Sequence, residues 1–301
     1  MKIVAAGMSG LVGRPLAFEL VKNHELVRLV RKESAISKRL PGREVAWNPN
    51  RIGDWAKEID GADVVINLCG EGIANHRWTP SRKRSLKESR LIPTRSLVEA
   101  IGLASKKPQA LLNASAIGFY GPRDNYLIDE ESGPGMGFLS DLCLAWENEA
   151  RRAEAQGIRV VLLRTGIVLA KEGGALAKMA PPFHFFLGGP LGDGAQVMSW
   201  VHIDDEVRGI LKILEDPLLR GPVNLTTSSP VTMDEFAEAL GKILRKPAVF
   251  RVPAFILRAL LGEMSEMLLT GQKVYPQKLK RAGFQFRFET LEEALKALLA
   301  A

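Results

Sequence analysis

The sequence predicts an α/β protein built on a doubly wound parallel sheet with helices on both faces, followed by a smaller mixed C-terminal region. Two observations predict this class. The first 30 residues contain an apolar run, a glycine-rich turn, an amphipathic segment and a second apolar run, which is the pattern of a βαβ unit. Later apolar runs do not alternate with polar residues, as expected for strands covered on both faces.

The elements follow in order along the chain. Residues 2–6 predict a strand, 11–23 a helix and 25–30 a second strand. A helix is also predicted over 80–104, and Pro93 is expected to disturb it. The remaining elements of this part are strands at 44–47, 63–68, 109–114 and 159–164 and a helix at 139–156.

The pattern changes after about residue 165. Residues 170–200, rich in Gly, Pro and Phe, are expected to form a loop beside a cleft. We therefore predict a nucleotide-binding domain over 1–224 and a substrate-side region over 225–301 that helps to wall the cleft. Helices at 203–215 and 232–244 and a strand at 248–252 are predicted here, and the tail at 286–301 ends in a helical sequence, TLEEALKALLA.

Composition narrows the class of protein. The chain has 301 residues, 46% hydrophobic and 25% charged, with a net charge of +7, which is typical of a globular domain. No apolar run reaches the roughly 20 residues that span a bilayer. The two cysteines, Cys69 and Cys143, favour neither a disulfide framework nor a zinc site. We expect a soluble cytoplasmic protein with no membrane partner and no bound metal, and the sequence specifies no oligomeric state.

The glycine-rich turn is the first candidate site. Gly7, Gly10 and Gly13 lie between the first strand and the first helix. A tight turn, close approach of backbone amides to a pyrophosphate and close helix packing each exclude a Cβ atom. The start of the helix also offers free N–H groups to phosphates. We expect a dinucleotide here, contacted by Gly7, Ser9, Gly10, Leu11, Val12 and Gly13.

The end of the second strand bears on which dinucleotide binds. NAD-specific sites place an acidic residue about 20 residues after the glycines, where this chain has Arg31 and Lys32. A guanidinium can pair with the 2′-phosphate of NADP. The pattern favours NADP over NAD, although Glu33 complicates the argument, and both residues could instead be solvated turn residues.

Four segments resemble the extended short-chain dehydrogenase/reductase superfamily, in the same order along the chain. The last is similar to a signature of nucleotide-sugar epimerases and dehydratases. The segments are Val64-Val65-Ile66-Asn67-Leu68-Cys69-Gly70, Asn113-Ala114-Ser115-Ala116-Ile117-Gly118-Phe119-Tyr120-Gly121, Arg164-Thr165-Gly166-Ile167-Val168-Leu169 and Trp200-Val201-His202-Ile203-Asp204-Asp205.

Three further patterns resemble a narrower branch, the NAD(P)-binding "epimerase family" proteins with their own C-terminal domain. They are GEGI…RWT at 70–79, PPF…LGGPLGDG at 181–194 and GE…LLTGQKVYP…GF at 262–284. The resemblance implies a Rossmann-type fold and a cleft beside the C-terminal part, without naming a substrate. It also implies that Leu68, Cys69, Gly70 and Glu71 contact the cofactor.

The proton donor usual in this superfamily is missing. Its members use a Tyr-x-x-x-Lys pair, in which the lysine lowers the tyrosine pKa. Residues four positions after Tyr120, Tyr126 and Tyr275 are Asp124, Glu130 and Leu279. Alignment of the predicted helix with that of the superfamily puts Phe138 and Leu142 near the expected positions of the pair.

Ser115 and Tyr120 remain as catalytic candidates. The superfamily serine lies four residues before the tyrosine of a V-Y-G motif, and counting from Tyr120 gives Ala116 whereas counting from Phe119 gives Ser115. Ser115 could therefore bind substrate or simply end a buried strand. Tyr120 could donate a proton or pack in the core, and Glu71 could be an acid/base group or a surface carboxylate.

These patterns leave three functions open. The first is an NADP-dependent oxidoreductase or epimerase acting on a small or nucleotide-linked substrate, such as a nucleotide-linked sugar. The second is a catalytically silent NADP(H)-binding regulator or sensor, because the Tyr/Lys pair is absent. A basic stretch at 82–90 could suggest a nucleic-acid binder, but it lacks interleaved aromatic residues and indicates a solvated helix face, so we expect no nucleic-acid partner.

Overall fold

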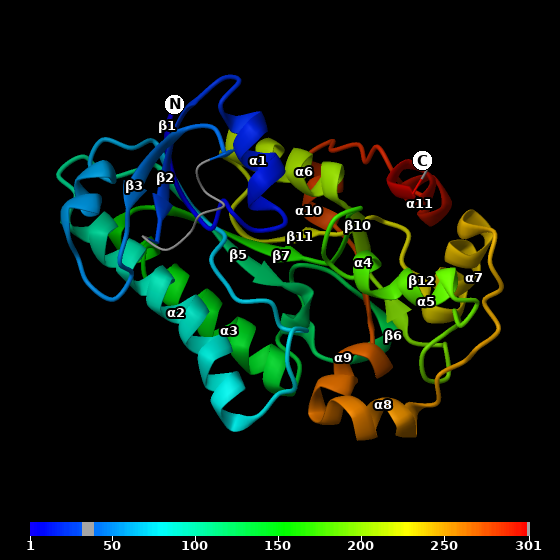
Figure 1. Ribbon diagram of the computed structural model, residues 1–301. Helices are drawn as coiled ribbons and strands as arrows, with labels where there is room; N and C mark the ends of the chain where they lie inside the picture. Colours follow the sequence, from blue (N-terminus) through cyan, green and yellow to red (C-terminus); the bar gives the residue numbers. More distant parts are fainter. Residues whose placement is uncertain (32–38, 300–301) are drawn as a thin grey trace.

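The centre of the computed structural model, which describes residues 1–31 and 39–299, is a seven-stranded sheet (Figure 1). Every neighbouring pair of its strands is parallel. The order is β11-β7-β5-β4-β1-β2-β3, so the chain reverses its direction of winding beside β1. The strands are β1 Lys2–Ala6, β2 Glu25–Val30, β3 Arg43–Ala46, β4 Val64–Asn67, β5 Ala110–Ala116, β7 Arg159–Thr165 and β11 Gly221–Leu225. The predicted fold class is confirmed.

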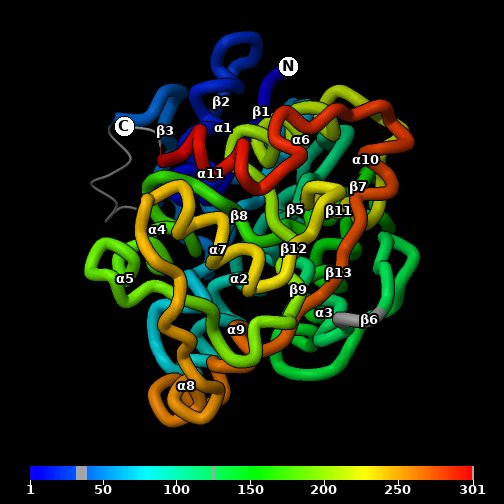
Figure 2. The backbone as a smooth tube through the Cα atoms, turned by 90° about the vertical axis from the view of Figure 1, so that its right-hand side faces the viewer, coloured from blue at the N-terminus to red at the C-terminus, as the bar shows by residue number. Residues whose placement is uncertain are grey.

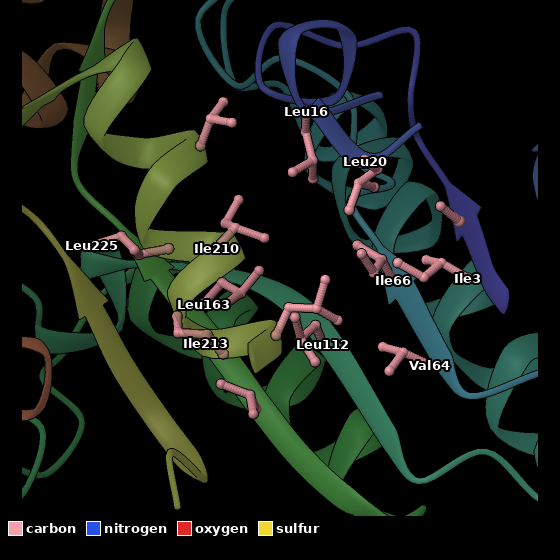
Figure 3. Packing of buried hydrophobic residues seen from close by; sticks show 14 of the residues in the cluster. Ile3, Leu16, Leu20, Val64, Ile66, Leu112, Leu163, Ile210, Ile213 and Leu225 are labelled. Atoms are coloured by element: carbon pink, nitrogen blue, oxygen red, sulfur yellow. The ribbon is translucent and has the colours of Figure 1, made fainter. Parts of the chain in front are cut away.

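Helices cover both faces of this sheet because successive strand residues point to opposite sides. Ile3 joins a core cluster with α1 (Gly13–Leu20) and α6 (Ile203–Glu215), as Figure 3 shows for Leu16 and Ile210. The next residue, Val4, joins a second cluster with α2 (Pro80–Leu103) and α3 (Phe138–Arg151). Both clusters are apolar, so the sheet is buried on each side.

The remaining elements lie outside the central sheet, and most of the helices among them belong to the C-terminal region. Figure 2 shows α7 and α11 on one flank and α8 at an outer edge. The helices are α4 Leu176–Met179, α5 Pro181–His184, α7 Met233–Leu244, α8 Ala254–Leu261, α9 Glu266–Leu269, α10 Gln277–Arg281 and α11 Leu291–Leu299. The short helical turns are η2 Asp54–Glu58, η3 Ile117–Tyr120, η4 Glu154–Gln156 and η5 Gly262–Ser265.

Three two-stranded sheets complete the structure. They pair β8 (Ile167–Leu169) with β10 (Trp200–His202), β9 (Val197–Met198) with β12 (Val231–Thr232), and β6 (Arg123–Ile128) with β13 (Gln272–Val274). The last pair joins the segment after β5 to the C-terminal region. Over the described ranges, no helix is both long and apolar enough to cross a membrane.

Two predicted elements differ from the structure. Helix α2 continues through Pro93, because packing against α3 compensates for the one backbone bond that proline removes. Residues 248–252 form no strand; Val252 makes one isolated bridge with Leu191. The central sheet ends at Leu225, one residue beyond the predicted boundary at 224.

Candidate functional site

A cavity of about 400 Å³ lies at the carboxyl ends of β1, β2 and β4. The strand order reverses here, so the loops that follow two neighbouring strands run in opposite directions. A crevice forms between these loops. The lining comes from those loops, from residues 47–50 and from one side of α2. It consists of Gly7, Met8, Ser9, Gly10, Arg28, Leu29, Val30, Arg31, Trp47, Pro49, Asn50, Leu68, Cys69, Gly70, Glu71, Ser85, Glu88, Ser89, Ile92 and Pro93.

The three glycines of the first loop have different reasons to lack a side chain. Gly7 has a φ of +84°, and a Cβ there would lie 2.5 Å from the carbonyl carbon of Leu68, so it fits the turn onto β4. A Cβ on Gly13 would lie 2.5 Å from the Gly7 oxygen and 2.6 Å from the Met8 Cα. A Cβ on Gly10 would meet only the Gly7 oxygen, at 3.3 Å. Gly10 therefore leaves space on the cavity side that the fold itself does not need.

Most of the predicted cofactor contacts line this cavity. They are Gly7, Ser9, Gly10, Arg31, Leu68, Cys69, Gly70 and Glu71. Of the other predicted residues in the described ranges, Gly13 packs on the loop, and Val12 contacts the core beside α1. The Leu11 side chain faces Gly173 and Gly174, so these two residues lie beside the glycine loop. Lys32 lies outside the described residues.

Positive charge reaches the cavity at the end of β2. Arg31 is exposed and lines the cavity, and its charge acts on the nearby Cys69 thiol. Burial nevertheless raises the pKa of Cys69 to about 12, so this thiol is protonated at neutral pH. The described residues at the end of β2, Leu29, Val30 and Arg31, include no carboxylate. An anionic group at this end of the cavity would face a guanidinium.

Trp47 is a lining residue that sequence reasoning missed. Its indole is 5% exposed and lies 5.7 Å from the ring of Trp55. The Nε1–H of Trp47 is buried and has no hydrogen-bond partner within the described parts of the chain. A buried donor without a partner is costly, and a bound molecule with an acceptor could supply one. A lone tryptophan beyond a short strand gave no signal of this position.

Glu71 lies at the opposite side of the cavity from β2. Its carboxylate pairs with Arg82, and its backbone N–H donates to the Ser89 hydroxyl at 3.2 Å. Its carbonyl oxygen accepts from Arg90 at 3.0 Å. These bonds fix the loop after β4 onto α2. Glu71 is therefore an ion-paired residue of the rim.

Ser115 points toward α3. Along β5 it shares a face with Leu111, which packs in the α2 and α3 cluster. Its hydroxyl is 5% exposed and donates to Glu147 Oε1 at 2.7 Å. Both oxygens of Glu147 also accept from Arg164, at 2.8 and 2.9 Å. This buried ion pair occupies the hydroxyl of the predicted catalytic serine.

Tyr120 extends the same polar network away from the cavity. Its side chain is fully buried, its hydroxyl donates to Asn224 at 2.7 Å, and it accepts from Arg164 at 2.9 Å. Burial raises the pKa of Tyr120 to about 12 and outweighs the opposite effect of Arg164. In a Tyr/Lys pair the lysine shifts the tyrosine pKa downward. The surroundings of Tyr120 shift its pKa in the opposite direction.

The positions expected for the Tyr/Lys pair are apolar in the structure as well. Phe138 packs edge-on against Trp78 with ring centroids 5.1 Å apart. Leu142 is 4% exposed and belongs to a cluster with Trp78, Leu86 and Met264. The C-terminal region thus contacts α2 and α3 where the superfamily has its proton relay. Among the described residues, no group of three His, Cys, Asp or Glu side chains could hold a metal ion.

Comparison with known proteins agrees with this architecture. Residues 3–224 match the "NAD dependent epimerase/dehydratase family" and 252–298 match "Domain of unknown function (DUF1731)". An epimerase family protein of Mycobacterium leprae is 42% identical over 295 residues, which cover 97% of this chain and 94% of the relative.

Two solved structures are also similar. Human epimerase family protein SDR39U1, determined with NADPH, has a TM-score of 0.89 and 31% identity, and the match covers 100% of this chain and 99% of that one. A nucleoside-diphosphate sugar epimerase from Corynebacterium glutamicum has a TM-score of 0.80 and 30% identity, over 99% of this chain and 58% of that one. The resemblance read from the sequence motifs is confirmed: this chain is an SDR39U1-like member of the NAD dependent epimerase/dehydratase family, with a C-terminal DUF1731 domain.

Proposed function

We propose that the cavity beside residues 7–10 binds NADP(H) in preference to NAD(H). One observation carries this proposal: Ser9, Gly10 and Arg31 line the same cavity. Backbone N–H groups at the start of α1 would hold the pyrophosphate, and the guanidinium of Arg31 would hold the 2′-phosphate. The open space at Gly10 and the unpartnered Trp47 donor fit a ligand here. The human relative determined with NADPH supports the choice.

The reaction that fits such a site is hydride exchange with a small or nucleotide-linked substrate. When bound, the cofactor supplies the hydride, and the chain would orient both partners in an oxidoreductase or epimerase. Phe138 and Leu142 cannot exchange a proton, so a donor other than a Tyr/Lys pair is required. Ser115 and Glu71 are proposed for that role, each after release from its present partner. The epimerases among the relatives make a nucleotide-linked sugar the leading substrate class.

A second candidate function is a catalytically silent NADP(H)-binding regulator or sensor. The apolar cluster around Phe138 and Leu142 favours it, because this cluster fills the place of the usual proton relay. Under this alternative the cofactor would be held without turnover. The two functions share the cofactor and differ only in chemistry.

The cofactor proposal is tested by Arg31→Asp in isothermal titration calorimetry. We expect NADPH affinity to fall by roughly 1.5–3 kcal/mol, as for a lost charge-assisted contact, with NADH affinity little changed. Arg281→Asp is the matched control, because Arg281 is exposed and does not line the cavity. An unchanged NADPH affinity of Arg31→Asp would show that Arg31 does not contact the cofactor.

Turnover separates the two functions. We expect NADPH absorbance to fall when some carbonyl compound or nucleotide-linked sugar is added, or a sugar epimer to form. Identification of small molecules that co-purify with the chain would choose the first substrates. Binding of NADPH without any reaction across a broad set would favour the silent regulator instead.

A further inference from the structure

An apolar surface lies on α8 and on the segments beside it. Half of the sixteen large hydrophobic side chains that are exposed among the described residues lie in two short stretches, 185–187 and 249–260. We call these eight side chains the apolar face. They are Phe185, Phe186, Leu187, Val249, Phe250, Phe255, Ile256 and Leu260. A concentration of this kind marks an interaction surface, whereas scattered exposed residues do not.

Backbone hydrogen bonds hold the two stretches together. The Phe250 N–H donates to the Gly188 oxygen at 3.1 Å, and the Val252 N–H donates to the Pro190 oxygen at 2.9 Å. Figures 1 and 2 both place α5 and α8 on one flank, with α8 at the outer edge of the molecule. The apolar face therefore belongs to one side of the protein.

Helix α8 shows how little of this surface serves the core. Its sequence is AFILRALL, yet only Leu257 is buried. Phe255 is 70% exposed and Leu260 is 62% exposed. Arg77 caps the end of the helix through the carbonyl oxygens of Ala259 and Leu260. The helix is anchored at its end and offers most of its apolar side chains to a partner.

The two segments that carry the apolar face are basic. Residues 173–192 and 239–262 contain no Asp or Glu but six Lys or Arg residues. Lys246 lies with its Nζ 3.8 Å from the centroid of the Phe186 ring, and Arg258 is exposed on α8. Lys242 and Arg251 pair with Glu292 and Asp234, which come from outside these stretches. A partner for this surface should be apolar inside and anionic at its boundary.

We infer that the protein docks on the surface of an anionic phospholipid bilayer through the apolar face. Phe and Leu side chains with flanking Lys and Arg are the composition of helices that lie in the membrane interface, and basic residues near the surface are attracted by anionic headgroups. No spanning helix is needed. The sequence predicted no membrane partner because it contains no segment long and apolar enough to span a bilayer, a criterion that does not address docking on the surface.

A second copy of this chain fits the same surface less well. A two-fold contact brings the same patch of both copies together, so the cations Lys246 and Arg258 of both copies would gather in one interface. Like charges juxtaposed in this way oppose association. The bilayer satisfies the apolar side chains and the cations at once.

The test is flotation with vesicles made of equal parts phosphatidylglycerol and phosphatidylcholine. We expect the protein to float with these vesicles and to stay behind with pure phosphatidylcholine. The double variant Phe255→Ser with Leu260→Ser should lower partitioning at least about tenfold. Its control, Leu103→Ser with Leu218→Ser, changes equally exposed leucines elsewhere and should partition as wild type.

A second pair of variants tests the charge. Lys246→Glu with Arg258→Glu should lower partitioning by about fivefold or more for each cation lost. Lys107→Glu with Arg220→Glu carries the same change in net charge at exposed positions away from the face, and should have a smaller effect. Equal effects of the two pairs would mean nonspecific attraction and would overturn the proposal.

Two further results would also overturn it. One is the absence of flotation with anionic vesicles. The other is a wild-type dimer in sedimentation velocity that is lost in the double variant Phe255→Ser with Leu260→Ser. The apolar face would then bind a second copy of the chain. Thermal unfolding of each variant checks that it remains folded. None of these measurements depends on NADP(H), so failure here leaves the proposed function standing.

Discussion

The polar side chains at the carboxyl end of β5 form hydrogen bonds with one another. Ser115 and Tyr120 are both connected to Arg164, the first through Glu147 and the second directly. Removing one partner of a buried ion pair is costly, because the remaining charged partner stays desolvated. At the scale of single residues, we therefore expect substitutions in this network to change the stability of the fold first.

Tyr120→Phe is the sharpest test of this network. It removes only the hydroxyl and leaves Asn224 and Arg164 each short of one buried hydrogen bond. We expect the free energy of unfolding to fall by about 1–3 kcal/mol, measured by urea denaturation. Ser115→Ala should cost less, about 1 kcal/mol. If turnover is found, a fall in kcat with unchanged stability in either variant would instead indicate a catalytic hydroxyl.

Glu206 gives a pH-dependent prediction. It is fully buried at the start of α6, accepts from Thr165 at 2.8 Å, and burial raises its pKa to about 8. The folded chain thus holds a proton that the unfolded chain has lost above pH 4.5, so this residue makes the fold less stable as pH rises toward 8.

We expect Glu206→Gln, which resembles the protonated acid, to match wild type near pH 4.5. Its advantage in melting temperature should grow up to about pH 8 and then level off. At about 1.4 kcal/mol per pKa unit, the gain at pH 8.5 would be a few kcal/mol. Thermal unfolding across this pH range measures it, and a constant difference between the two proteins would contradict the assignment.

The turn into α1 lets binding be separated from folding at the scale of an element. Gly10→Val adds a side chain where the fold has room, whereas Gly13→Ala places a Cβ 2.5 Å from the Gly7 oxygen. We expect Gly10→Val to abolish measurable cofactor binding with little change in melting temperature. Gly13→Ala should lower the melting temperature by several degrees, as for a loss of about 1–3 kcal/mol from overpacking. Calorimetry measures cofactor binding and thermal unfolding measures the stability of both variants. A cofactor affinity of Gly10→Val equal to that of wild type would argue against the assignment of this loop as the cofactor site.

The C-terminal region is tied into the core of the whole molecule. Phe284 and Phe286 pack in the cluster that contains α1 and α6. Asp205 on α6 accepts from the backbone N–H groups of Arg287 and Phe288, both at 2.9 Å. A region held by both apolar and polar contacts should unfold together with the sheet.

Phe284→Ala should therefore lower the melting temperature of a single calorimetric transition. The expected loss is about 2–4 kcal/mol, as for a large buried side chain. Phe255→Ala is the control, because Phe255 is exposed and should change stability little. Two separate transitions, with only the lower one affected, would show that the C-terminal region folds independently.

The central sheet and the glycine turn were predictable from the sequence. Strands 2–6 and 25–30 match the structure residue for residue, because apolar runs and glycine turns are local signals. The absence of a Tyr/Lys pair is also visible in the sequence, because it depends only on the spacing of residues along the chain. The continuous helix through Pro93 and the pairing of β6 with β13 were not predicted, since long-range packing decides them.

The sequence by itself determined the parallel sheet, the loop at Gly7–Gly13 and the family. Only the tertiary structure decided which side chains surround the cavity and which do not. Trp47 and residues of α2 reach it from distant segments, and Tyr120 is buried because Arg164 and Asn224 meet there from two other strands. The physical reason is that periodicity fixes the local conformation of a segment, whereas the surroundings of a side chain depend on what the fold brings beside it.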